Sequence, residues 1–376
     1  MIIGVNIIKN NMEISKPTKL SEKTKQTIAK LMDSDFVADI FNKKLSNYYP
    51  DFAKVIGINL KPFKKHLGIT SAVFVVEYKI NYQSPDGQKK ALNIFASAHS
   101  DGSRQGAYRK TKIIYEHGFD QGKYRVTRPL FFLPEQKAFV YEASLGQSFF
   151  NFFSQDPQAD LTAVLSLAAG WIKKLHSLEL YSKKFDWGHF NIDEMVPSPK
   201  IFLADFMSKD KEQGLLVDSL LAGLKNFQLK LDSQIKKTVI YGDYHPENII
   251  IRDLQADYLE MIDFTDIAFG DPMIDLGAFL QQFDFMGHSF ISRQKINEYK
   301  KYFVESYFGQ DLAEISAGFF ARINLYQSWT ALRTAVFLFY MKDPENPIDD
   351  LLQDALGHLK LSETQQKEIN LYHHHD

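Results

Sequence analysis

The chain has 376 residues, of which 45% are hydrophobic, and this size favours two lobes with separate cores. Its basic and acidic residues nearly cancel to a formal net charge of -2, so the charge predicts a small-molecule partner rather than nucleic acid or an anionic membrane. Cysteine is absent, which excludes disulfides, thiolate nucleophiles and cysteine-ligated zinc.

The two ends of the chain carry no targeting or metal-binding signal. Residues 1–15 are apolar only briefly and lack the basic start and small-residue cleavage site of a signal peptide. No stretch approaches the roughly 20 uninterrupted apolar residues that span a bilayer. We therefore expect a cytoplasmic protein without a membrane partner. The terminal run His373, His374 and His375 is excluded as a metal site.

The first half of the chain predicts a helical segment followed by a small antiparallel sheet. Apolar residues recur at helical spacing after Ser21, which is suited to cap a helix. Farther on, runs rich in Val, Phe and Tyr flank turn residues at 84–87. These patterns predict, in chain order, a helical stretch at 21–49, strands at 69–81 and 91–98, a helix at 104–117, and strands at 128–133 and 137–142.

Past Ser144 the pattern changes to long amphipathic helices. Apolar residues at a period of 3.6 predict helices at 161–178, 215–231 and 313–340. One compact β segment at 238–264 interrupts them. The predicted organisation is a helical N-terminal extension (1–66), a β-rich N-lobe (67–143) and a mainly helical C-lobe (144–376).

The β segment holds the residues that indicate chemistry. Phosphoryl transfer needs a carboxylate that accepts a hydroxyl proton and oxygen ligands that hold magnesium against the phosphates. Asp243 precedes Asn248 by five positions, the interval of a kinase catalytic loop, and Asp263-Phe264 follows after a predicted hairpin. For each residue taken alone, hydrogen bonds within a turn are the better explanation. All three in this order, flanked by strands, predict a phosphotransfer centre.

The same residues resemble the aminoglycoside phosphotransferase and choline kinase family. The family signature HGDxHxxN appears as Tyr241–Asn248, and the family's Asp-Phe element and GDPxxDL stretch appear as Asp263-Phe264 and Gly270–Leu276. The resemblance extends from about Leu67 to Tyr340. It implies an α+β, protein-kinase-like bilobal fold with a small antiparallel β-rich N-lobe and a larger, mainly helical C-lobe.

The resemblance also implies roles for individual residues. Asp243 would be the catalytic base, with His245 and Asp275 bracing its loop. Asn248 and Asp263 would hold Mg²⁺.

A nucleotide site follows from the same resemblance, with ATP or GTP as phosphate donor. Gly68, Thr70 and Ser71 lie where the family has its phosphate-covering hairpin. The segment from Glu142 to Ser144 lies at the expected hinge, where backbone groups would meet the adenine edge.

One departure concerns the phosphate-gripping lysine of the family. Asn93 stands where the strand lysine is expected, so its positive charge is missing. Lys110, on the next predicted helix, is a candidate to contact the phosphates instead. A solvated basic helix face is the alternative interpretation of Lys110.

We predict a kinase for a small hydroxylated acceptor such as an amino alcohol, a sugar or an aminoglycoside-like compound. The helix at 323–340 offers Tyr326 and Trp329, which could hold a quaternary ammonium through cation-π contact, and Arg333, which could pair with an anionic acceptor. A stripe of helix core is the alternative. Asn93 favours a second interpretation, a catalytically weak or silent nucleotide-binding protein. A protein kinase is disfavoured because the segment between Asp263 and Asp275 is too short for a peptide platform.

Overall fold

The structure, a computed structural model, describes residues 19–180, 185–231, 235–341 and 347–372. The expectations for residues 1–15 and for His373, His374 and His375 lie outside these ranges. The described chain forms two compact units. The first, called the sheet unit, comprises residues 19–145 and 260–265, and the second, called the helical unit, comprises residues 146–259 and 266–372.

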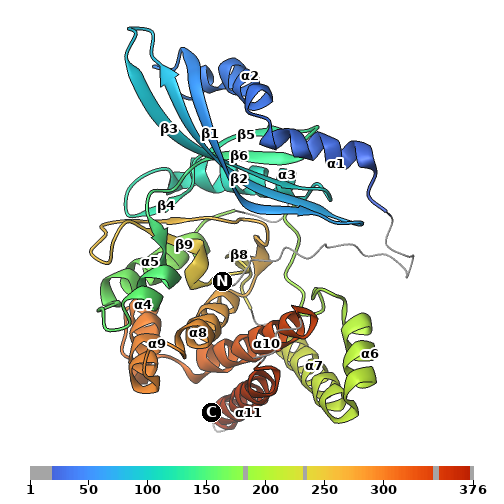
Figure 1. Ribbon diagram of the computed structural model, residues 1–376. Coiled ribbons are helices and arrows are strands. Elements are labelled where there is room, and N and C mark those ends of the chain that lie inside the picture. The colour runs from blue at the N-terminus through green and yellow to red at the C-terminus, as the bar shows by residue number, and fades with distance from the viewer. Residues whose placement is uncertain (1–18, 181–184, 232–234, 342–346, 373–376) are drawn as a thin grey trace. The chain divides into compact units, whose positions relative to one another are not determined.

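The sheet unit is built around a five-stranded antiparallel sheet of order β1-β2-β3-β6-β5 (Figure 1). Its elements are α1 (Glu22–Ala29), α2 (Ser34–Lys44), β1 (Lys54–Leu67), β2 (Ala72–Gln83), β3 (Lys89–His99), α3 (Ser103–Ile114), β4 (Tyr124–Val126), β5 (Pro129–Leu133) and β6 (Ala138–Glu142). The predicted hairpin, the helix after it and the second strand pair are confirmed within a few residues as β2, β3, α3, β5 and β6.

Alternating side chains give the sheet two different faces. The buried positions of β2 and β3, among them Phe74, Val76 and Ile94, join the apolar residues of α1 and α2 in one core cluster. Side chains on the other face of the sheet, such as Phe132 and Phe139, pack on Tyr108 of α3. Their ring centroids lie 6.4 and 5.5 Å from the Tyr108 ring centroid. The sheet is therefore covered by α1 and α2 on one face and by α3 on the other.

The prediction of a helical N-terminal extension that ends at residue 66 is wrong for residues 54–66. Residues Lys54–Leu67 form the 14-residue edge strand β1, which pairs with β2 along its whole length. An edge strand exposes one face and one border to solvent, and charged residues and proline are common there. Several lysines and Pro62 accordingly interrupt the apolar alternation, and the register shifts between Pro62 and Lys64. Between residues 19 and 53, the first described stretch of this extension, the helical part consists of α1, α2 and short 3₁₀ turns.

The helical unit packs its long helices around short strand pairs (Figure 1). Its elements are β7 (Gln147–Ser148), α4 (Phe149–Gln155), α5 (Thr162–His176), α6 (Pro199–Lys209), α7 (Lys211–Leu231), β8 (Thr238–Ile240), β9 (Ile249–Ile251), β11 (Ala268–Gly270), α8 (Met273–Gly287), α9 (Arg293–Phe308), α10 (Ala317–Met341) and α11 (Ile348–Tyr372). The strand β10 (Leu259–Met261) lies where the chain leaves this unit for the sheet unit. The α+β arrangement, a β-rich first part followed by a mainly helical second part, is confirmed.

The helices α4, α6, α8, α9 and α11 were not predicted from the sequence, and among these α8 has a clear physical reason. Twelve of its fifteen residues are buried, so it lacks the polar face that produces a period of 3.6. α8 starts within the Gly270–Leu276 motif and packs against α10.

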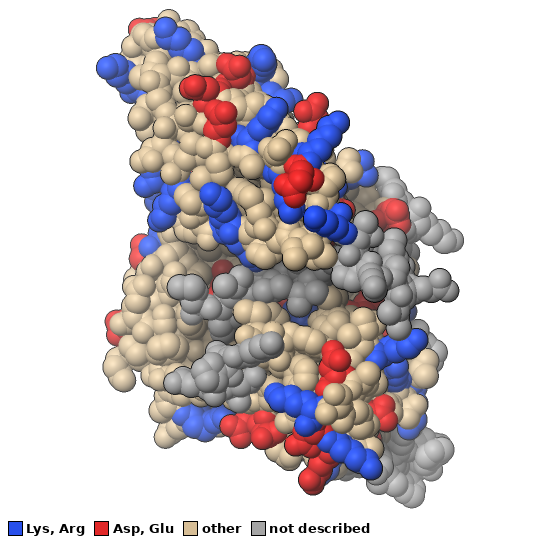
Figure 2. All heavy atoms as spheres, turned by 45° about the vertical axis from the view of Figure 1, so that its right-hand side comes forward, with Lys and Arg blue, Asp and Glu red and all other residues tan. Residues whose placement is uncertain are grey.

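No helix in the described part of the chain is long and apolar enough to cross a bilayer. On the face shown in Figure 2, basic and acidic side chains are interspersed, in keeping with the small net charge.

Candidate active site

The segment Tyr241–Asn248 is a tight loop that leaves β8 in the helical unit. Gly242 has φ of +85°, and a Cβ atom there would lie 2.5 Å from the carbonyl oxygen of Asp266. Only glycine fits both the left-handed conformation and this close approach. The loop is thereby pressed against the chain that leads into β11, the strand paired with β8.

Asp275, on the first turn of α8, holds this loop in place. Its carboxylate is fully buried and accepts hydrogen bonds from the backbone N–H groups of Tyr241 and Gly242, each at 2.7 Å. It also contacts Nε2 of His176 at 2.9 Å, and Nδ1 of that histidine lies 2.8 Å from the Tyr307 hydroxyl. The sequence-based expectation that Asp275 braces the loop agrees with these contacts, and His176 extends the brace to α5 and α9.

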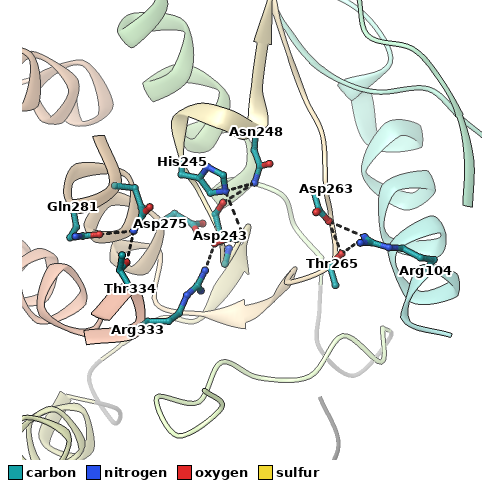
Figure 3. A network of polar contacts seen from close by, with 12 residues as sticks. Arg104, Asp243, His245, Asn248, Asp263, Thr265, Asp275, Gln281, Arg333 and Thr334 are labelled. Carbon is teal, nitrogen blue, oxygen red and sulfur yellow. Dashed lines mark hydrogen bonds and ion pairs between the residues drawn. The ribbon is translucent and has the colours of Figure 1, made fainter. Parts of the chain in front are cut away.

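Asp243, His245 and Asn248 converge at the open end of the loop (Figure 3). Nε2 of His245 lies 3.4 Å from Oδ2 of Asp243 and 3.0 Å from Nδ2 of Asn248. The same Asn248 amide donates to the backbone carbonyl of Asp243 at 3.2 Å. Burial favours the neutral imidazole, but the Asp243 carboxylate outweighs it and raises the pKa of His245. His245 therefore ties the two polar side chains together.

Arg333 of α10 forms an ion pair with Asp243 through its Nη2 and the carboxylate Oδ1 (Figure 3). Burial alone would raise the pKa of Asp243, but the charges of Arg333 and then His245 hold it below its usual range. The carboxylate is thus ionised at neutral pH. From the sequence, Arg333 was predicted only as a possible contact of an anionic acceptor. Its direct contact with the predicted base was not predicted.

Asp263 belongs to the sheet unit and adopts a strained backbone, with φ of +59°. Its Oδ1 accepts hydrogen bonds from the Thr265 hydroxyl at 2.6 Å and from Arg104 Nη1 at 3.2 Å (Figure 3). Arg104, on the first turn of α3, is only 7% exposed, and sequence reasoning missed it. The sequence offers one signal for Arg104. This arginine lies shortly after β3, the strand that lacks the expected lysine, so it could supply the missing positive charge.

Two lysines complete a basic cluster around this segment, which we define as Arg104, Lys64 and Lys110. Lys110 donates to the backbone carbonyl of Thr265 at 2.8 Å. Burial, and after it the charge of Arg104, lowers the pKa of Lys64, while Asp263 opposes the shift. Asn93 on β3 is exposed and carries no charge. The positive charge missing from β3 is therefore present in the same unit on β1 and α3.

The predicted nucleotide contacts in the sheet unit lie on two separate segments. Gly68, Thr70 and Ser71 form the turn between β1 and β2, closed by a hydrogen bond from Gly68 N to Ser71 O at 2.8 Å. At the end of β6, the N–H of Glu142 donates to Arg128 O, and its carbonyl accepts from the Thr127 hydroxyl.

The hinge residues after β6 are also partly engaged. The N–H of Ala143 donates to Asn93 O at 3.0 Å, and the Ser144 hydroxyl donates to Glu260 at 3.2 Å. The backbone N–H groups of Glu142 and Ala143 are therefore both engaged within the sheet unit.

The donor chemistry suits magnesium rather than zinc. The Asn248 amide nitrogen is committed to the loop, so its Oδ1 is the atom that can face a cation. Within the described ranges, no group of three or more His, Asp or Glu residues has the geometry of a metal site. Mg²⁺ commonly takes one or two protein oxygen ligands and completes its shell with water and substrate phosphates.

Comparison with known proteins identifies a family for the part of the chain that contains this site. The phosphotransferase enzyme family model (APH) matches residues 86–314, well over half of the chain, a range that includes Asp243, Asn248 and Asp263. Comparison with curated protein sequences gives no match.

Solved structures resemble the chain at low sequence identity. Amicoumacin kinase hAmiN in complex with AMP-PNP, Ca2+ and Ami matches with a TM-score of 0.52 and 12% identity, over 92% of this chain and 96% of that one. The streptomycin-ATP-APH(2")-IIa ternary complex matches with a TM-score of 0.51 and 15% identity, over 86% and 95% of the two chains. Choline kinase LicA from Streptococcus pneumoniae matches with a TM-score of 0.48 and 14% identity, over 86% of this chain and 99% of that one.

The first two likenesses confirm the predicted kinase-like fold. Together with the family match, which spans the loop at Tyr241–Asn248, they also confirm the family prediction made from the motifs. The chain belongs to the phosphotransferase enzyme family.

Proposed function

We propose that this protein is a magnesium-dependent kinase that transfers the γ-phosphate of ATP or GTP to a hydroxyl group of a small molecule. The observation that carries the proposal is the Asp243 carboxylate, ionised and held in a loop that is fixed by His245 and Asp275. The acceptor oxygen forms a bond to the γ-phosphorus, the bond from that phosphorus to the β–γ bridging oxygen breaks, and the nucleoside diphosphate leaves. The hydroxyl proton passes to Asp243.

Asn248 of the helical unit and Asp263 of the sheet unit are the proposed Mg²⁺ ligands. When bound, the ion neutralises charge on the β- and γ-phosphate oxygens. The strained φ of Asp263 supports a functional role, because such conformations persist where the surrounding contacts over-determine them. The hydrogen bonds from Thr265 and Arg104 provide such contacts.

The basic cluster supplies charge for the phosphates in this proposal. Arg104 and Lys64 take the part of the absent strand lysine, and Lys110 holds the backbone at Thr265. Two similar structures are nucleotide complexes, with AMP-PNP and Ca2+ in the amicoumacin kinase and with ATP in the streptomycin complex. A nucleotide and a divalent ion are accordingly the ligands that we propose for this chain.

A second candidate function is a catalytically weak or silent nucleotide-binding protein. Asn93 in place of the strand lysine favours it, as does the ion pair that engages the proposed base. Both candidates predict magnesium-dependent nucleotide binding, and only the kinase predicts acceptor-stimulated nucleotide consumption.

The test is an acceptor screen that follows nucleotide consumption, with Asp243→Asn as the first variant. We expect consumption to fall by roughly 100-fold or more in Asp243→Asn while the nucleotide-induced thermal shift persists. Binding without turnover over the whole acceptor panel would favour the silent protein. Equal turnover by the wild type and Asp243→Asn would exclude Asp243 as the base.

The basic cluster has a matched control on the same helix. Lys110→Met and Arg104→Met are expected to weaken nucleotide binding, whereas Lys112→Met is expected to leave it unchanged, because Lys112 is half exposed and pairs with Glu116 at 3.7 Å. An unaltered nucleotide affinity in Lys110→Met would remove this lysine from the mechanism.

A further inference from the structure

The guanidinium of Arg333 is held rigidly beside the proposed base. It lies over the ring of Trp329, 5.3 Å from the ring centroid. Trp329 in turn donates from Nε1 to the carbonyl of Ile192 at 3.1 Å and packs edge-on against Phe190, with centroids 5.0 Å apart. Arg333 is consequently pre-organised by its neighbours before any ligand binds.

This guanidinium also remains accessible. The side chains of Arg333 and Asp243 are 35% and 29% exposed. A guanidinium has five N–H donors, and within the described residues the hydrogen bond to Asp243 is the single one that Arg333 makes. A side chain that served only to brace a carboxylate would need no exposed donors. A ligand that reaches Asp243 would therefore also come close to the exposed guanidinium.

The charge of Arg333 discriminates between classes of acceptor. An ammonium group placed next to Asp243 would meet the arginine charge at short range, which disfavours cationic acceptors. An oxyanion would instead gain charge-assisted hydrogen bonds from the guanidinium. Burial lowers the pKa of Arg333, but the charges of Asp243 and then Asp266 outweigh it and raise that pKa.

Building on the proposed kinase function, we propose that the acceptor is a small alcohol carrying a carboxylate or phosphate group close to the reacting hydroxyl. The spacing follows from the contact between Arg333 and Asp243, since one ligand must reach both side chains. Hydrogen bonds of roughly 2.8 Å to each side chain leave room for only a few bonds between hydroxyl and oxyanion. Short hydroxy acids and short phosphorylated alcohols meet this condition.

The experiment uses acceptors of matched shape. 3-Hydroxybutyrate is compared with 3-hydroxybutyramide, glycerol 1-phosphate with glycerol, and choline and ethanolamine serve as cations. The wild type is expected to show a kcat/KM roughly 10- to 100-fold higher for one of the two oxyanions than for its neutral partner. The two pairs distinguish a carboxylate site from a phosphate site. Faster turnover of choline or ethanolamine than of both oxyanions would overturn the proposal and leave the kinase function intact.

Variants assign the preference to Arg333. In Arg333→Gln the ratio of kcat/KM between oxyanion and neutral partner is expected to fall close to one, and Arg333→Lys should retain part of it. The ratio is taken within one variant, so a general loss of activity cancels. The control is Arg293→Gln, which removes another guanidinium paired with a carboxylate, that of Asp284. The Arg293 side chain is 65% exposed. An unchanged ratio in Arg333→Gln would overturn the proposal.

Direct binding separates this proposal from the kinase function. Calorimetric titration with 3-hydroxybutyrate and with glycerol 1-phosphate is expected to show binding of one oxyanion to the wild type and none to Arg333→Gln. That result would support the oxyanion site even if no acceptor were phosphorylated. Absence of oxyanion binding to the wild type would reject it.

Discussion

At the scale of single residues, the loop Tyr241–Asn248 depends on the buried carboxylate of Asp275. Both of its oxygens are engaged, Oδ1 by the N–H of Gly242 and Oδ2 by the N–H of Tyr241 and by His176. A fully buried charge is stable only where such donors surround it. The same bonds fix the backbone immediately before Asp243, so the position of the proposed base depends on a residue 32 positions away in the chain.

We predict that Asp275→Asn lowers both stability and turnover. Asparagine offers one oxygen, so one backbone N–H of the loop would face an amide NH₂ group and lose its acceptor. We expect a loss of about 3 kcal/mol in the free energy of unfolding, measured by urea denaturation. The control Asp218→Asn, on the exposed side of α7, should change stability by less than about 0.5 kcal/mol. Equal stabilities of the two variants would contradict this role.

At the scale of elements, the contact between α8 and α10 sets the distance from Arg333 to the loop. The two helices approach closely at Gly277, where an added Cβ would lie 2.6 Å from Cβ of Tyr326 and 2.9 Å from the backbone at Ile323 and Gln327. Backbone atoms cannot move away independently, so a side chain at this position must separate the helices. α8 carries Asp275 and α10 carries Arg333, so this packing governs both sides of the proposed base.

We predict that Gly277→Ala destabilises the protein by about 1–3 kcal/mol through this steric conflict. Gly357→Ala on α11 provides the opposite case, because a Cβ atom added there would have no other atom within 4 Å. Alanine favours the helix there by up to about 1 kcal/mol. Thermal unfolding of both variants tests the prediction, and a loss of stability in both would indicate a general effect of replacing glycine.

At the scale of the whole molecule, each unit has its own core, and the short segment 260–265 passes from the helical unit into the sheet unit. Glu260 opens this segment. Burial, opposed in part by the Ser144 hydroxyl and Arg125, raises the pKa of Glu260 to about 7. Its ordinary value is near 4.5, so between these two values the folded chain binds more protons than the unfolded chain. The contribution of Glu260 to stability is therefore full below about pH 4.5 and is lost as the pH rises through about 7.

We predict that Glu260→Gln is more stable than the wild type at pH 8 and loses this advantage at pH 5. The expected difference between the two pH values is on the order of 2 kcal/mol, after allowance for the solvent that reaches this half-buried group. Urea unfolding of both proteins at both pH values measures it. An equal difference in the free energy of unfolding between the two proteins at pH 5 and pH 8 would contradict the raised pKa of Glu260.

The sequence by itself determined the family, the α+β class and the order of Asp243, Asn248 and Asp263. These features are local, because a loop motif, a turn or an amphipathic period can be recognised from a short run of consecutive residues. The interior strands β2 and β3 were predictable for the same reason, whereas the edge strand β1 and the mostly buried helix α8 lack a clear period and were not.

The tertiary structure alone decided the charges that act on the proposed site. Arg333 contacts Asp243 across 90 positions of sequence, and Arg104 contacts Asp263 across 159. Such pairs arise when separately folded elements pack together, and their partners leave no periodic or motif signal in either segment. The sequence therefore specified the proposed base and metal ligands, while packing specified the cations that tune them and, through Arg333, the class of acceptor that we propose.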